Sequence, residues 1–154
     1  TILLAVPAHF PVNQMLNVFS LSSQDVLARK FEDPACPSIT LKDFGDTPFI
    51  LLTSGNNLRK RSMTFFEEAG ITPNITMEVS QLVTSFHLSR SGIGAAFISD
   101  WMLTNAHPEM SYYKINSPAA VRMFDIVTSG KNYLSKAQKA FIDLFQSYYK
   151  NYIY

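Results

Sequence analysis

The chain has 154 residues and a mass of 17.3 kDa, with 47% hydrophobic and 16% charged residues. This length is sufficient for one domain with a hydrophobic core. Because 13 basic side chains are balanced by 12 acidic ones, no field of one sign attracts a polyanion, and direct binding of DNA or RNA is not expected.

The predicted elements are, in chain order, strand 2–6, helix 24–31, a short element at 39–44, strand 49–52, helix 58–69, strand 75–79, helix 81–90, strand 95–98, a brief helical turn at 101–103, strands 112–115 and 123–128, and a last helix opened by Ser135. Strands and helices alternate over most of the chain. This order predicts an α/β fold with a sheet that is at least partly parallel.

The expected ends of these helices follow from capping chemistry. Ser23, Ser80 and Asp100 each precede a predicted helix and are expected to cap it. Gly70 is expected to stop helix 58–69 in the left-handed conformation. The last helix carries apolar residues at helical spacing, which predicts a stripe facing a core: Ala137, Phe141, Leu144, Phe145 and Tyr148.

A glycine turn joins helix 81–90 to the next strand. Gly92 and Gly94 bracket a single residue, so the backbone can reverse tightly without meeting a Cβ atom. Residues 95–98 are all apolar, which is typical of a strand covered on both faces.

Polar residues follow two predicted strands at the point where each strand ends. In open α/β sheets, ligands bind beyond the carboxyl ends of the strands, where helix N–H groups point outward. Such residues also cap helices and form turns, and the sequence leaves both interpretations open. The candidate residues for a small anionic or polar molecule are Thr53, Ser54, Gly55, Asn56, Asn57, Leu58, Ser80 and Gln81.

Little in the sequence points to catalysis, a metal or a cofactor. The histidines His9, His87 and His107 are scattered, and the chain has neither a zinc spacing nor a Gly-x-Ser-x-Gly elbow. It also lacks a phosphate loop and a dinucleotide fingerprint. We therefore predict no enzymatic activity and no cofactor, and interpret residues 59–61, Arg-Lys-Arg, as a solvated helix face.

Cysteine content and hydropathy indicate the compartment. Cys36 is the single cysteine and cannot form an internal disulfide, which fits a reducing compartment. The apolar runs are too short to cross a bilayer, and residues 1–7 lack the features of a signal peptide. We expect a cytoplasmic protein without a membrane partner, cut from a longer chain because a strand begins at once without an initiating Met.

Five segments, in order along nearly the whole chain, resemble motifs of the LysR-type transcriptional regulators. They are Val6-Pro7-Ala8-His9-Phe10-Pro11, the segment 39–44 with Pro48-Phe49-Ile50, Leu58-Arg59 with Phe66 and residues 69–73, residues 91–98, and Leu134-Ser135-Lys136-Ala137 with Phe141-Ile142. Three departures stand beside them: Phe10 interrupts the first motif, residues 14–38 are longer than usual, and Ser99 replaces a common proline.

The resemblance implies an effector-binding domain with the fold of a type 2 periplasmic binding protein, a mixed sheet with helices on both faces. Residues 1–120 would form most of the second lobe, and residues 121–154 would return toward a first lobe that is largely missing. A DNA-binding helix-turn-helix would also lie outside this chain. Residues 53–58 match the family segment that lines the effector cleft.

The expected function is therefore sensory. A small molecule would bind between the lobes and change how a full-length homo-oligomer engages its operator. Oligomerisation is expected because the apolar stripe of the last helix needs cover. The alternatives are a solute-binding lobe of a transport system and an enzyme of the same fold, for which the sequence offers no obvious catalytic residue.

Overall fold

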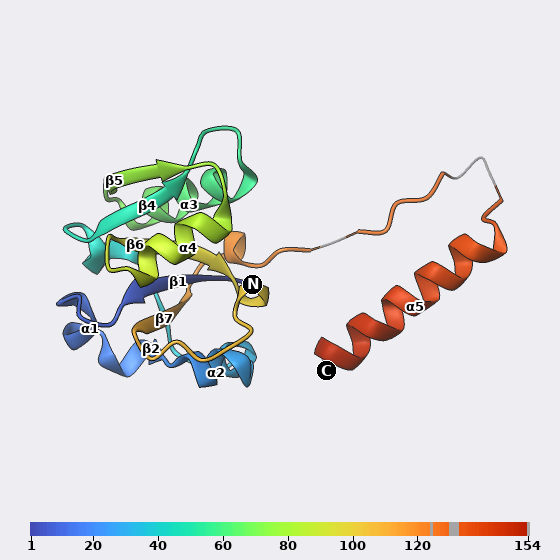
Figure 1. Cartoon of the computed structure of the whole chain (residues 1–154), viewed down its shortest axis with the longest axis horizontal. Coiled ribbons are helices and arrows are strands. Elements are labelled where there is room, and N and C mark those ends of the chain that lie inside the picture. Colours follow the sequence, from blue (N-terminus) through green and yellow to red (C-terminus); the bar gives the residue numbers. More distant parts are fainter. Residues whose placement is uncertain (124, 130–132, 154) are drawn as a thin grey trace. The chain divides into compact units, whose positions relative to one another are not determined.

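A mixed sheet lies at the centre of Thr1–Arg122, the first of two units in this computed structural model (Figure 1). Within the described residues, its seven strands are β1 (Ile2–Pro7), β2 (Ser20–Leu21), β3 (Ser38–Ile39), β4 (Pro48–Leu52), β5 (Asn74–Val79), β6 (Ala95–Ser99) and β7 (Met110–Ile115). Their order is β2-β7-β1-β6-β4-β5, and β3 also pairs with β7. Strand β4 is parallel to β5 and β6, whereas β1 is antiparallel to β6 and β7, so the predicted α/β class is confirmed.

The structure describes residues 1–123, 125–129 and 133–153, apart from the side chains of 149–153. The helices are α1 (Val12–Met15), α2 (Ser23–Leu27), α3 (Asn57–Ala69), α4 (Leu82–Arg90) and α5 (Lys136–Ile153), and the 3-10 turns are η1 (Asn17–Phe19), η2 (Lys30–Glu32), η3 (Leu41–Phe44), η4 (Asp100–Met102) and η5 (Pro118–Ala120). The second unit, Met123–Tyr154, contains α5. The assignment of residues 1–120 and 121–154 to two lobes stays a prediction.

Strand β1 shows why the sheet carries helices on both faces. All six of its residues are buried. Leu4 contributes to an apolar cluster that includes Phe65 of α3, whereas Leu3 contributes to a second cluster that includes Phe86 of α4. Because successive side chains of a strand point to opposite faces, an uninterrupted apolar strand needs cover on both.

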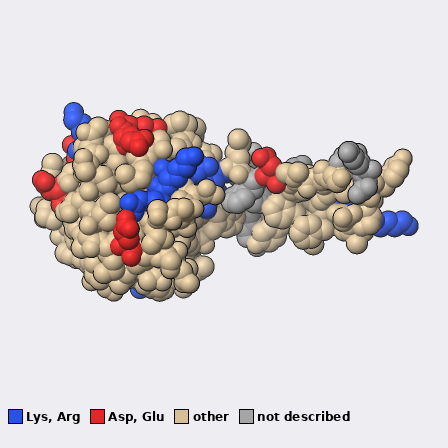
Figure 2. Space-filling model, turned by 90° about the horizontal axis from the view of Figure 1, so that it is seen from above, with Lys and Arg blue, Asp and Glu red and all other residues tan. Residues whose placement is uncertain are grey.

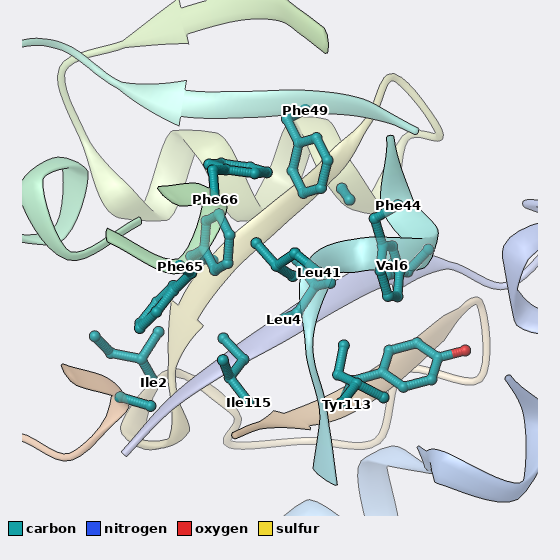
Figure 3. Packing of buried hydrophobic residues seen from close by; sticks show 14 of the residues in the cluster. Ile2, Leu4, Val6, Leu41, Phe44, Phe49, Phe65, Phe66, Tyr113 and Ile115 are labelled. Atoms are coloured by element: carbon teal, nitrogen blue, oxygen red, sulfur yellow. The ribbon is translucent and has the colours of Figure 1, made fainter. Parts of the chain in front are cut away.

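Aromatic rings fill the layer between the sheet and α3 (Figure 3). The ring of Phe49 on β4 meets the ring of Phe66 on α3 edge to face, with 4.8 Å between centroids. It also stacks on Phe97 of β6 at 5.9 Å. This packing fixes β4, the strand that leads into α3, relative to the middle of the sheet.

The glycine turn forms as predicted. Gly92 has φ +85°, a left-handed conformation that glycine adopts without strain, and its N–H donates to the carbonyl of Ser89 at 2.8 Å. The chain then enters β6, all five residues of which are buried. Gly70 likewise ends α3 with φ +67°, as expected.

The helix predicted at 24–31 forms only in part, as α2 followed by η2, and its cap is displaced by one residue. Ser22, not Ser23, forms a capping box with Asp25, whereas the Ser23 hydroxyl donates to the carbonyl of His107 at 2.9 Å. Hydrogen bonds from Lys30 and then from Ser22 lower the pKa of Asp25 from 3.8 to about 2. The charged form of Asp25 therefore stabilises the fold above pH 3.8, and this contribution is lost as the pH falls through about 2.

Three further predictions differ from the structure. Gln81, not Ser80, occupies the cap position of α4, and its side chain makes no capping bond. Ser99 occupies the cap position of η4, while Asp100 accepts a hydrogen bond from the amino group of Thr1 at 2.9 Å. The strand predicted at 123–128 is wrong: residue 123 and residues 125–128 are not in a strand, and residue 124 lies outside the described residues. A strand needs a partner as well as an apolar sequence, which pattern alone does not reveal.

The last helix begins where Ser135 predicts. The Ser135 hydroxyl accepts from the N–H of Gln138 at 3.2 Å, and the Gln138 side chain accepts from the N–H of Ser135 at 2.8 Å. The predicted stripe on α5 is not covered by its own unit, since Phe141 is 65% exposed, Leu144 68% and Tyr148 53%; its cover by a neighbouring copy stays a prediction. Helical periodicity predicted the stripe, but it does not specify which surface covers it.

Candidate functional site

The two polar segments predicted from the sequence lie at the same edge of the sheet. Strands β4 and β5 run parallel with Leu52 opposite Val79, and the N–H of Thr53 donates to the carbonyl of Val79 at 2.9 Å. Ser80 follows Val79 directly, so both strands end side by side. We call Thr53–Leu58 with Ser80–Gln81 the β4–β5 edge.

Local chemistry explains how α3 starts at this edge. Gly55 has φ +90°, which permits the turn out of β4. The side-chain carbonyl of Asn56 then accepts from the N–H of Leu58 at 2.8 Å, and Leu58 is buried. Asn56 therefore caps α3, which is one of the two interpretations that the sequence left open. Apart from the buried Leu58, the other residues of the edge are exposed, as Asn56 is: Thr53, Ser54, Gly55, Asn57, Ser80 and Gln81.

Replacing Asn56 with alanine should lower the free energy of unfolding by about 1 kcal/mol, because the first turn of α3 loses its side-chain acceptor. Urea unfolding followed by circular dichroism measures this loss. Asn57→Ala is the matched control, since Asn57 is exposed and lies one residue beyond the cap; it should change stability by less than about 0.5 kcal/mol. Equal losses in the two variants would contradict the capping role.

Arg59 lies next to the β4–β5 edge, and the sequence interpretation missed its contacts there. Its guanidinium donates to the carbonyl of Leu52 at 2.9 Å and pairs with the Glu78 carboxylate at 2.5 Å, and its side chain is 17% exposed. Arg61 similarly donates to the carbonyl of Ala119 at 2.6 Å. Two of the three basic residues assigned to a solvated face are thus held by the protein itself. The sequence signal that could have indicated these contacts is the position of Arg59 in the first turn of the helix that follows strand β4.

The electrostatics of the β4–β5 edge suit an anion more than a cation. Both α3 and α4 begin here, and in these fully described helices neither first turn contains an acidic side chain. Helix N-termini carry N–H groups without intrahelical acceptors and a partial positive charge. Since Glu78 is already paired with Arg59, the edge offers donors, hydroxyls and amides.

Two other features, a metal-binding group and a membrane-spanning helix, are not found in the described part of the chain. It contains no group of three or more His, Cys, Asp and Glu side chains that could hold a metal ion. None of its helices is long and apolar enough to span a membrane. The face seen in Figure 2 carries basic and acidic side chains in separate groups, without one continuous field of either sign.

A model of the LysR substrate binding domain matches residues 26–150, most of the chain. The chain belongs to this family. The match confirms the resemblance carried by the five sequence motifs. The family is one of transcriptional regulators, so the domain is that of a regulator and not of an enzyme.

A curated relative agrees with this assignment. The HTH-type transcriptional regulator YybE of Bacillus subtilis (strain 168) is 28% identical over 104 residues, which are 68% of this chain and 35% of that protein. The chain thus spans about a third of the length of this curated relative. A regulator is thereby favoured over the transport protein that was the alternative.

Solved structures show the same fold. The effector binding domain of QuiR in complex with shikimate has a TM-score of 0.59 and 22% identity, covering 97% of this chain and 61% of that one. The regulatory domain of CcmR from Synechocystis PCC6803, in complex with 2-PG, has a TM-score of 0.65 and 14% identity, covering 97% and 63%. The periplasmic-binding-protein-like α/β fold is therefore confirmed, and the chain spans about three fifths of these domains.

Proposed function

We propose that this chain is the sensory part of a bacterial LysR-type regulator and that its β4–β5 edge forms one wall of a cleft for a small anionic or polar effector. One observation carries the proposal: the hydrogen bond from Thr53 to Val79 aligns the ends of two parallel strands. The N-termini of α3 and α4 therefore open at one edge, next to exposed hydroxyl and amide side chains.

The binding chemistry follows from these groups. A carboxylate or phosphate of the effector would accept hydrogen bonds from first-turn N–H groups of α3 and α4. Ser54, Asn57 and Gln81 would orient its polar substituents. Shikimate and benzoate, named with structures of similar fold, are carboxylates, which supports an anionic ligand for this chain.

Regulation would follow from differential binding. An effector that binds a closed arrangement more tightly than an open one shifts the population of a full-length homo-oligomer, and so its contact with the operator. DNA contact would come from a helix-turn-helix domain of the full-length regulator. The protein would act in the cytoplasm, where a bacterial operator lies.

Calorimetry on the full-length regulator tests the site. We expect saturable binding of shikimate or benzoate, weakened at least fivefold by Ser54→Ala and by Asn57→Ala, because each variant removes a polar partner without altering the fold. The control is Thr72→Ala, an exposed residue just before the amino end of β5. The proposal fails if the wild type binds neither carboxylate, or if both edge variants bind with the affinity of the control.

A further inference from the structure

A cavity of about 310 Å³ lies at the other end of β4, away from the β4–β5 edge. Strand β4 begins at Pro48, which lines this cavity, and ends at Leu52, which precedes the β4–β5 edge. We call it the acidic cavity. Its lining residues are Phe10, Pro11, Val12, Met15, Asp43, Asp46, Thr47 and Pro48.

The floor of the acidic cavity is apolar and belongs to the main core. Phe10 and Val12 are buried members of the cluster packed between the sheet and α3. Met15, at the end of α1, is 71% exposed and lies at the rim. A volume near 300 Å³ is at the lower limit of small-molecule sites, so the space suits a compact ligand with an apolar body.

Thr47 supplies a polar group without a partner. The residue is 6% exposed, and within the described residues its hydroxyl makes no hydrogen bond, although its N–H donates to the carbonyl of Phe44 at 3.1 Å. The Thr47 hydroxyl retains some solvent accessibility, unlike the Ser89 hydroxyl, which is fully enclosed and has no partner. Thr47 lines the acidic cavity, so its unpartnered hydroxyl adds a polar group to the residues around this space.

Two unpaired carboxylates complete the lining. Asp43 and Asp46 are exposed, and among the described residues neither has an ion-pair or hydrogen-bond partner. Two other aspartates, by contrast, are paired: Asp25 with Lys30, and Asp100 with the amino group of Thr1. Because no basic side chain lines the cavity, its lining carries two negative charges that attract a cation.

We propose that the acidic cavity binds a small organic ammonium compound with an apolar body. The ammonium group has three donors, which match the carboxylates of Asp43 and Asp46 and the hydroxyl of Thr47. The apolar body lies on Phe10 and against Met15. The proposal is independent of the effector proposed above, since the two sites lie at opposite ends of β4 and favour opposite charges.

The test uses 2-phenylethylamine as the probe and calorimetry on the full-length protein. We expect the amine to bind at least tenfold more tightly than the neutral 2-phenylethanol and the anionic phenylacetate, which share its ring. Methylammonium, which lacks the ring, should also bind at least tenfold more weakly. Ser54→Ala at the β4–β5 edge should leave binding of the amine unchanged.

Variants locate the binding. Asp46→Asn and Thr47→Val should each weaken amine binding at least threefold, and the Asp43→Asn, Asp46→Asn double variant at least tenfold. Glu68→Gln, which removes an exposed charge on α3, is the matched control. Should Thr47→Val unfold, the exposed aspartate variants still decide the result. Equal affinities for amine, alcohol and acid, or undiminished binding to the double variant, would overturn the proposal.

Discussion

Replacing Phe49 with alanine is expected to lower the free energy of unfolding by about 3–5 kcal/mol. The side chain is fully buried, so the variant loses its transfer free energy and leaves a cavity between the sheet and α3. The edge-to-face contact with Phe66 and the stacking on Phe97 are lost with it. Such aromatic pairs contribute beyond the area they bury.

Urea unfolding monitored by circular dichroism measures the effect. The matched control is Val18→Ala on η1, where the side chain is 72% exposed and its removal should change stability by less than about 0.5 kcal/mol. A loss below about 1 kcal/mol in Phe49→Ala would show that the aromatic layer does not hold β4 and α3 together as the contacts indicate.

Gly94→Ala is the second substitution with a large expected effect. It should lower the free energy of unfolding by about 3 kcal/mol, which is in the upper part of the range for over-packed sites. A Cβ atom at this position would lie 2.8 Å from the carbonyl oxygen of Pro48 and 3.2 Å from a side-chain carbon of Ile50. The closest atom is backbone of the neighbouring strand, which cannot rotate aside. Relief therefore requires β4 and β6 to separate where Phe49 pairs with Ala95.

Gly45→Ala provides the matched control for this clash. Gly45 has φ −55°, a conformation that alanine adopts readily, and a Cβ atom there meets nothing within 4 Å. This variant should leave stability unchanged or raise it by about 0.5 kcal/mol, because alanine restricts the unfolded chain. Differential scanning calorimetry should show a clearly lower Tm for Gly94→Ala only. Equal Tm values would mean that the two strands separate at little cost.

The sequence predicted those elements that depend on local chemistry. A buried strand needs an apolar run, and residues 2–6, 49–52 and 95–98 have one. A helix stop needs a residue that tolerates positive φ, which Gly70 supplies. The family motifs were also readable, because their residues hold fixed places along the chain.

Neighbouring candidates for one local role were harder to separate. Ser22 and Ser23 both suit a helix cap, and Ser22 is the cap because Asp25 lies three residues further on and closes the capping box. Ser23 is instead held by the distant carbonyl of His107. The apolar pattern at 123–128 predicted a strand, but a strand also needs a neighbouring strand to pair with, which the pattern does not reveal.

Local patterns in the sequence predicted most of the helices and strands, the family and the polar character of residues 53–58, since each depends on residues close together in the chain. The three-dimensional fold was needed to bring Thr53 beside Val79, to bond Arg59 to Leu52 and Glu78, and to place Thr47 with two unpaired carboxylates in the lining of one cavity. These arrangements depend on strand order and register. Register is set by the burial of side chains distant in sequence, so local patterns do not specify it.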